Sequence, residues 1–267
     1  MDKEETKGRW AVVTGASSGF GADFARELAT YDCNLVITAR REERLGALKE
    51  EIKQKHAISV DVIPKDLIAD QAPQQLYEQI KSKGIDIDVL INNAGFGLYG
   101  EFVALDWEDQ KAMLRLNILA LTQITWLFVH PMIERNSGFI SHVASNSAYQ
   151  PSPLYATYGA IKSFVLNFSF ALRNELRGTA VKCSAISPGP MVTEFQQVSG
   201  QDKNHPYIRL NKVTSGQVAK GGIDAMLKGK ASLIPGWSVA LTAWLSQRAP
   251  TRWSTALTGC LMRLQPR

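Results

Sequence analysis

The sequence contains little cysteine, no long uninterrupted apolar run and no acidic residue near its C-terminal end. Three cysteines among 267 residues are too few and too widely spaced for a disulfide framework or a zinc cluster. This usage predicts a reducing compartment, and we expect a cytoplasmic location. Residues 118–129 form the longest apolar stretch, which polar residues interrupt and which is too short to span a bilayer. The charged N-terminal segment predicts no signal peptide.

The distribution of charge argues against a nucleic-acid partner. The net charge is +5, but no acidic residue follows Asp224, and six Lys and Arg residues lie beyond it. The preceding part of the chain therefore carries a net charge of about −1. A nucleic-acid-binding domain presents a basic face on its folded body. We therefore expect no nucleic acid as a partner.

Short apolar runs alternate with helical patterns between residues 9 and 190. The runs are continuous rather than alternating, which is typical of parallel strands buried on both faces. The pattern predicts an α/β fold: a Rossmann-like doubly wound parallel sheet of about seven strands with helices on both faces, in one domain over residues 1–267. The predicted strands are 10–14, 34–38, 59–64, 89–92, 138–143, 181–187 and 231–235, and the predicted helices are 19–30, 41–55, 71–83, 107–133 and 156–177.

A glycine-rich turn joins the first predicted strand to the first predicted helix. It contains the candidate cofactor-binding residues Gly15, Ser17, Ser18, Gly19, Phe20 and Gly21. Glycine lets a backbone turn tightly and approach a pyrophosphate, which the helix N-terminus then holds. The alternative interpretation is a helix N-cap formed by Ser17 or Ser18. The position between strand and helix favours the phosphate loop.

The end of the second predicted strand bears on the choice of cofactor. NAD sites place an acidic residue about 20 residues beyond the glycines, on the ribose 2′-hydroxyl. Here Ala39 takes that place and Arg40 follows. A guanidinium pairs with a phosphate in a fork, so we predict NADP(H) as the cofactor, bound through Arg40. The alternative is that Arg40 and Arg41 only begin an exposed helix.

A tyrosine and a lysine four residues apart, Tyr158 and Lys162, lie on one face of a predicted helix. A nearby ammonium favours the phenolate, so we expect a lowered Tyr158 pKa and acid–base chemistry near neutral pH. The spacing also occurs by chance. Ser145, just beyond the fifth strand, is placed to hold a substrate oxygen, with Ser141 and Ser147 as rivals. Asn117 could anchor a water molecule bonded to Lys162.

The order of these motifs, from Gly15 to Thr193, resembles that of the short-chain dehydrogenase/reductase family. The resemblance implies that Asn117, Ser145, Tyr158 and Lys162 form the catalytic tetrad, with Tyr158 and Lys162 also meeting the cofactor. It implies further cofactor contacts at Asp66 and Leu67 (adenine), Asn92, Asn93, Ala94 and Gly95 (ribose), and Pro188, Gly189 and Thr193 (nicotinamide).

The implied function is an NADP(H)-dependent oxidoreductase that transfers a hydride between nicotinamide and a small-molecule carbonyl or secondary alcohol. Tyr158 is then the general acid or base. No metal is expected, and we interpret the four histidines as structural or surface residues. The alternatives are a membrane-associated reductase of long-chain acyl or sterol-like carbonyls and a non-catalytic dinucleotide sensor. We expect a homodimer or homotetramer, paired through helices 107–133 and 156–177.

The C-terminal part of the chain is harder to interpret. We expect residues 194–212 to form a lid over the substrate and residues 236–267 to form an amphipathic extension. Trp237, Leu241 and Trp244 lie at helical spacing, and beyond Pro250 a second apolar stripe begins at Trp253. We expect these stripes to pack on the body, on a second subunit or over the pocket. The less favoured alternative is a membrane surface, with Trp and Arg at the headgroups.

Overall fold

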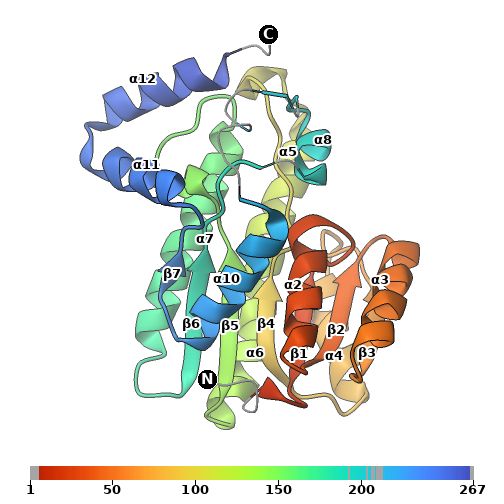
Figure 1. The fold of residues 1–267 in the computed structure, drawn as a ribbon. Coiled ribbons are helices and arrows are strands. Elements are labelled where there is room, and N and C mark those ends of the chain that lie inside the picture. The colour runs from red at the N-terminus through yellow and green to blue at the C-terminus, as the bar shows by residue number, and fades with distance from the viewer. Residues whose placement is uncertain (1–5, 192, 203, 206–207, 209–212, 265–267) are drawn as a thin grey trace.

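The computed structural model describes residues 6–264 apart from 192, 203, 206–207 and 209–212. Its centre is a seven-stranded parallel sheet in the order β3-β2-β1-β4-β5-β6-β7 (Figure 1). This confirms the predicted Rossmann-like doubly wound fold, and the predicted element boundaries agree to within two residues at each end. The strands are β1 (Trp10–Thr14), β2 (Asn34–Ala39), β3 (Val60–Pro64), β4 (Ile87–Asn92), β5 (Gly138–Val143), β6 (Val181–Ile186) and β7 (Ser232–Leu233).

Helices cover both faces of the sheet and bury separate cores. On β1, Ala11 and Val13 join one core, whereas Val12 between them joins the other. This two-sided burial explains why the strands read as continuous apolar runs. One face carries α2 (Gly19–Thr30), α3 (Glu42–Lys55) and α10 (Ser215–Leu227), and the other carries α4 (Ala72–Ser82), α6 (Leu121–Glu134) and α7 (Ala156–Glu175).

The predicted helix 107–133 is one continuous helix with an irregular turn. It runs through α5 (Trp107–Leu114), the π-helical turn η2 (Arg115–Ala120) and α6. By length and composition alone the whole of Trp107–Glu134 could also cross a membrane, but 50% of its most apolar window is buried inside the protein. Its α6 part packs on β4 and β5, as a core helix of this fold does.

The C-terminal segment stands apart from these layers. After the short helix α8 (Glu194–Ser199), part of the predicted lid lies outside the described residues. Helices α11 (Trp237–Arg248) and α12 (Thr251–Met262) then form a hairpin that projects from the body (Figure 1). Trp237 and Trp253 are 81% and 64% exposed. Of the three expected coverings of the stripes, packing on the body is therefore wrong for the single chain, and packing on a second subunit stays a prediction.

Candidate active site

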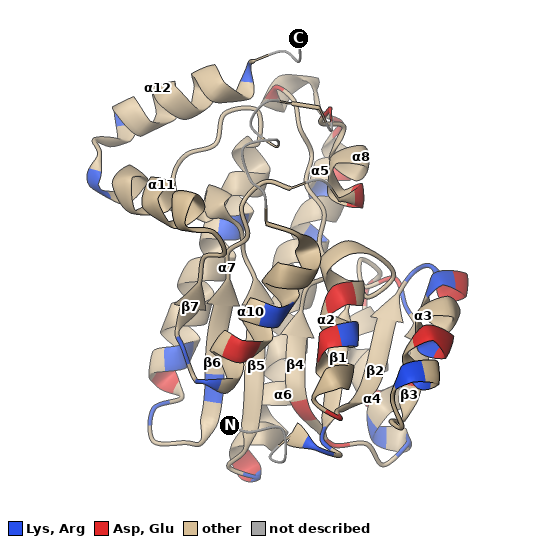
Figure 2. Ribbon diagram, in the orientation of Figure 1, with Lys and Arg blue, Asp and Glu red and all other residues tan. Residues whose placement is uncertain are grey.

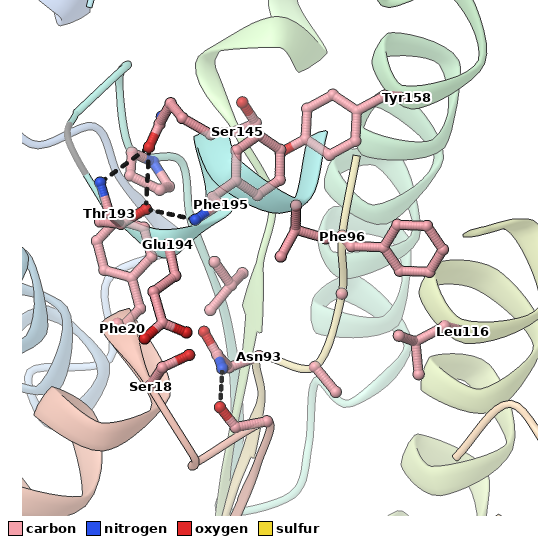
Figure 3. A pocket seen from close by; sticks show the side chains of 18 of the residues that line it. Ser18, Phe20, Asn93, Phe96, Leu116, Ser145, Tyr158, Thr193, Glu194 and Phe195 are labelled. Carbon is pink, nitrogen blue, oxygen red and sulfur yellow. Dashed lines mark hydrogen bonds between the residues drawn. The ribbon is translucent and has the colours of Figure 1, made fainter. Parts of the chain in front are cut away.

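The glycine-rich turn allows close packing that side chains would prevent. Gly15 has a φ of +69°, and a Cβ there would lie 2.8 Å from the Cα of Ala94. A Cβ on Gly21 would lie 2.2 Å from the carbonyl oxygen of Gly15. Asn93 holds the turn from the other side, since its Nδ2 donates to the carbonyl oxygens of Thr14 (2.9 Å) and Gly15 (3.3 Å). Figure 3 shows one hydrogen bond of the Asn93 side chain.

The two serines of this turn do not cap the helix. Ser18 occupies the N-cap position of α2, but its side chain forms no capping hydrogen bond. Instead Arg41 donates to the Ser18 hydroxyl (2.7 Å) and to the Ser17 hydroxyl (3.0 and 3.1 Å). The alternative of a serine N-cap is therefore wrong. An uncapped helix N-terminus is free to bind an anion.

The two arginines after β2 have different surroundings. Arg40 lines the pocket and forms no hydrogen bond or ion pair within the described residues. Arg41 also pairs with Glu194 at the start of α8 (2.8 Å), and Arg44 pairs with the same carboxylate (2.5 Å). Hydrogen bonds from Arg41 and Arg44 lower the pKa of Glu194 to about 2. No sequence motif predicted this link between α3 and α8.

A pocket of about 310 Å³ extends from the glycine-rich turn to the start of α7. Every predicted catalytic or cofactor-binding residue lines it except Gly21, Asn92 and Asn117. The predicted residues that line it are Gly15, Ser17, Ser18, Gly19, Phe20, Arg40, Asp66, Leu67, Asn93, Ala94, Gly95, Ser145, Tyr158, Lys162, Pro188, Gly189 and Thr193.

Three predicted residues, Gly21, Asn92 and Asn117, do not line the pocket. Asn92 belongs to a core network, in which its Nδ2 donates to the Thr125 hydroxyl (2.9 Å). Asn117 lies in the π-helical turn, and its Nδ2 donates to the carbonyl oxygens of Phe96 (3.1 Å) and Met113 (2.9 Å). Its buried Oδ1 accepts no hydrogen bond within the described residues.

Ser145 and Tyr158 come together at one end of the pocket. Ser145 precedes the turn η3 (Asn146–Tyr149), where its hydroxyl accepts from the Ser147 amide (3.2 Å), and Tyr158 lies in the first turn of α7. The Ser145 side chain acts on the Tyr158 hydroxyl in the direction that lowers its pKa. Ser141, by contrast, is fully buried within β5 and bonds to Ser184. This geometry favours Ser145 over Ser141 as the substrate-binding serine, and Ser147 also lines the pocket.

Burial, rather than attraction between charges, has the largest effect on the pKa values of Tyr158 and Lys162. It raises the pKa of the Tyr158 hydroxyl above its ordinary value, and the Ser145 side chain offsets only part of this rise. Burial also lowers the pKa of the Lys162 ammonium to about 8. Its Nζ donates to the carbonyl oxygen of Val143 (2.8 Å) and lies 5.6 Å from the centre of the Tyr158 ring. The expected lowering of the Tyr158 pKa is thus wrong for the chain alone.

The substrate end of the pocket is aromatic, and the sequence did not reveal this. The Phe195 ring lies 5.3 Å from that of Tyr158, in centroid distance (Figure 3). Gly97 makes room for both rings, since a Cβ there would lie 2.6 Å from the Phe195 Cζ. Further lining residues that we did not predict include Lys65, Phe96, Leu116, Tyr155, Val198 and Met262.

Comparisons with known proteins agree with this arrangement. Residues 9–204 match the model of the family described as short chain dehydrogenase. The chain is 32% identical over 244 residues to a human very-long-chain 3-oxoacyl-CoA reductase (86% of this chain, 77% of that one), and 32% identical over 242 residues to human 17-beta-hydroxysteroid dehydrogenase type 3 (again 86% and 77%).

Among solved structures, a short-chain dehydrogenase from Sphingobium yanoikuyae in complex with NADPH is similar over 96% of both chains, with a TM-score of 0.82 and 26% identity. Its fold agrees with the sheet order and helix layers described above. The predicted resemblance is therefore confirmed. This chain belongs to the short-chain dehydrogenase/reductase family of oxidoreductases.

Proposed function

We propose that this oxidoreductase transfers a hydride between NADP(H) and a carbonyl or secondary alcohol on a bulky apolar substrate. One observation carries the proposal. A single pocket joins two parts: the glycine-rich turn with Arg40, which has no partner among the described residues, and the buried group of Ser145, Tyr158 and Lys162. The first part is suited to a dinucleotide, and the second to proton transfer at an oxygen.

The chain's own residues fit NADP(H). The close approaches at Gly15 and Gly21 leave the backbone bare, as a pyrophosphate requires. Arg40 follows β2 in the place where an NAD site has a carboxylate, and its guanidinium is free within the described residues to meet a 2′-phosphate. The NADPH complex of the Sphingobium protein supports the same choice.

The roles of the catalytic residues follow from their positions. The bound cofactor would supply or accept the hydride at its nicotinamide ring. The hydroxyl of Ser145 would hold the substrate oxygen beside that of Tyr158. In the reductive direction, Tyr158 gives its proton to that oxygen, and it takes the proton back in the oxidative direction. Lys162 is held by the Val143 carbonyl close to the Tyr158 ring, where its charge would stabilise the phenolate.

The class of substrate is inferred from the apolar residues that line the pocket and that the sequence did not predict. Phe96, Phe195 and Met262 cluster with Tyr158, and Leu116 and Val198 are further apolar residues of the pocket lining. The Tyr155 hydroxyl is already bonded to Ser199 (3.2 Å) and Gln201 (3.0 Å). Such a lining suits a long acyl chain or a fused-ring ketone. The names of two relatives, a very-long-chain 3-oxoacyl-CoA reductase and a hydroxysteroid dehydrogenase, support this class.

The same proposal includes pairing of two chains through the η2–α6 and α7 surface. Leu119 (63%), Trp126 (60%) and Phe170 (40%) are exposed there in the single chain. An exposed apolar surface of this kind favours a symmetric homo-oligomer. Light scattering at micromolar concentration tests it, and a monomer would contradict it. The cytoplasmic location stays a prediction.

NADPH oxidation, followed by its absorbance, tests the activity. The substrates compared would be medium- and long-chain 3-oxoacyl thioesters, steroid ketones and small ketones. We expect turnover to increase with apolar size and to be much faster with NADPH than with NADH. Tyr158→Phe is the matched control, because it keeps the ring and removes the proton. Equal turnover with NADH, or turnover of small ketones alone, would contradict the proposal.

A further inference from the structure

Helix α12 exposes large apolar side chains, whereas three of its four buried residues are small or carry a hydroxyl, and the fourth is Met262. Trp253 and Leu257 are each 64% exposed, and Leu264 just beyond the helix is 47% exposed. Ser254, Thr258 and Gly259, on the opposite side, face the body. A surface helix of a soluble protein has the reverse arrangement. The exposed side of α12 is therefore suited to an apolar environment.

Helix α11 repeats the pattern. Its exposed stripe has helical spacing and contains Trp237 (81%), Leu241 (46%), Trp244 (49%) and Leu245 (50%). Only the small or branched Val239 and Ala243 are buried. The two helices together thus expose apolar side chains as a group on the projecting hairpin. Single, scattered exposed apolar residues are ordinary on a protein surface, but a group of this kind calls for an explanation.

The charges on the hairpin all have one sign. Arg248, Arg252 and Arg263 are exposed, and the hairpin contains no acidic residue, as Figure 2 shows. At helical spacing, Arg252 and Arg263 both lie along one edge of the exposed stripe of α12. The Arg248 guanidinium lies 4.0 Å from the centre of the Trp244 ring. Tryptophan beside arginine is typical of helices that lie at the level of lipid headgroups.

The hairpin is also connected to the catalytic pocket. Met262, in the last turn of α12, lines that pocket and packs with Tyr155 and Tyr158. Its carbonyl oxygen accepts hydrogen bonds from the Tyr99 hydroxyl (2.5 Å) and from the His205 ring (3.3 Å). Any surface that binds α12 is therefore held close to the substrate end of the pocket.

We propose that the α11–α12 hairpin lies in the interface of a bilayer that contains anionic lipids. Apolar side chains enter the boundary between headgroups and acyl chains, and the arginines meet the phosphates. Charge favours lipid over a second copy of this chain. Two hairpins packed face to face would bring arginines together with no carboxylate on either side to pair with them. The proposal concerns binding alone and does not depend on the catalytic activity.

Vesicle flotation of the full chain tests the proposal, with phosphatidylcholine vesicles containing or lacking phosphatidylserine. We expect binding that is stronger with phosphatidylserine and weakened by salt. The double variant Trp237→Gln/Trp253→Gln should bind roughly tenfold less, because two exposed rings no longer enter the lipid. Arg248→Gln/Arg252→Gln should remove the preference for phosphatidylserine.

Phe102→Gln is the matched control, since the Phe102 ring just before α5 is 56% exposed but lies outside both the hairpin and the proposed pairing surface. It should bind vesicles like the unmodified chain. Thermal unfolding and light scattering of each variant separate lipid binding from folding and from assembly. No flotation of the unmodified chain, or an equal loss with Phe102→Gln, would overturn the proposal. A third result would also overturn it: the unmodified chain does not bind vesicles, and the Trp237→Gln/Trp253→Gln variant forms a smaller assembly. The apolar surface of the hairpin would then be covered by a second copy of the chain.

Discussion

The sheet and the C-terminal hairpin use apolar periodicity in opposite ways. In the sheet and its helices the apolar positions face inward, and Leu90 on β4 is fully buried. In the hairpin the apolar positions face outward, and Leu257 on α12 is 64% exposed. Periodicity identifies the side of a helix that avoids water. What covers that side depends on the rest of the protein and on its surroundings.

The largest expected difference between the two regions is catalytic. Tyr158→Phe should lower turnover about 10²- to 10⁴-fold, because it deletes the proton donor while keeping the ring. Trp253→Gln on the hairpin should leave turnover of a water-soluble substrate unchanged. Initial rates with saturating NADPH check both, and fluorescence titration should show NADPH binding retained in both. Full turnover by Tyr158→Phe would assign the proton to another group.

Two leucine substitutions, one in the sheet and one in the hairpin, should change the free energy of unfolding by different amounts. Leu90→Ala should lower the free energy of unfolding by about 2–5 kcal/mol, because it leaves a cavity between the sheet and its helices. Leu257→Ala should change it by less than about 0.5 kcal/mol, since the side chain is exposed in the single chain. Urea unfolding without lipid measures both. A large loss with Leu257→Ala would show that the hairpin is covered by protein.

The sequence predicted the sheet region well because its signals are local. The phosphate loop, the Tyr158–Lys162 pair and the strand ends each lie within a few residues of one another. The substrate end depends on contacts between distant segments. Arg41 meets Glu194 across 153 positions, and Tyr99 meets Met262 across 163. No local pattern marks such pairs.

The sequence also could not predict which way side chains point at Asn117 and in the hairpin. Asn117 lies in a π-helical turn, which changes the direction of its side chain relative to a regular α-helix. Helical spacing placed Trp237 and Trp253 on stripes, but it could not tell the inward side from the outward one. Only the position of the body relative to α12 decides that.

Arg40 and Arg41 permit a finer comparison within the sheet region itself. Arg40→Ala should weaken NADP(H) binding by about 1.5–3 kcal/mol and leave NAD(H) nearly unchanged, because a charge-assisted bond to the 2′-phosphate is lost. Arg41→Ala removes the contacts to Ser17, Ser18 and Glu194, and should weaken both cofactors alike. Fluorescence titration with each cofactor measures the two effects. Selectivity retained in Arg40→Ala would assign the 2′-phosphate to another residue.

The smallest expected effect concerns the link between the sheet region and α8. Hydrogen bonds from Arg41 and Arg44 lower the pKa of Glu194 from its ordinary 4.5 to about 2. Because the folded-state pKa is the lower one, this pairing stabilises the protein above pH 4.5 and is lost as the pH falls toward 2.

Glu194→Gln should therefore reduce stability at pH 7 and flatten its decline with acid. The carboxylate is 39% exposed, so solvent screening limits the effect to about 1 kcal/mol or less. Urea unfolding at neutral and acidic pH, at low and high salt, measures it. Glu78→Gln on α4 is the control, since Glu78 forms no ion pair within the described residues. Equal pH profiles for the two variants would mean that the bridge to α8 does not hold in solution.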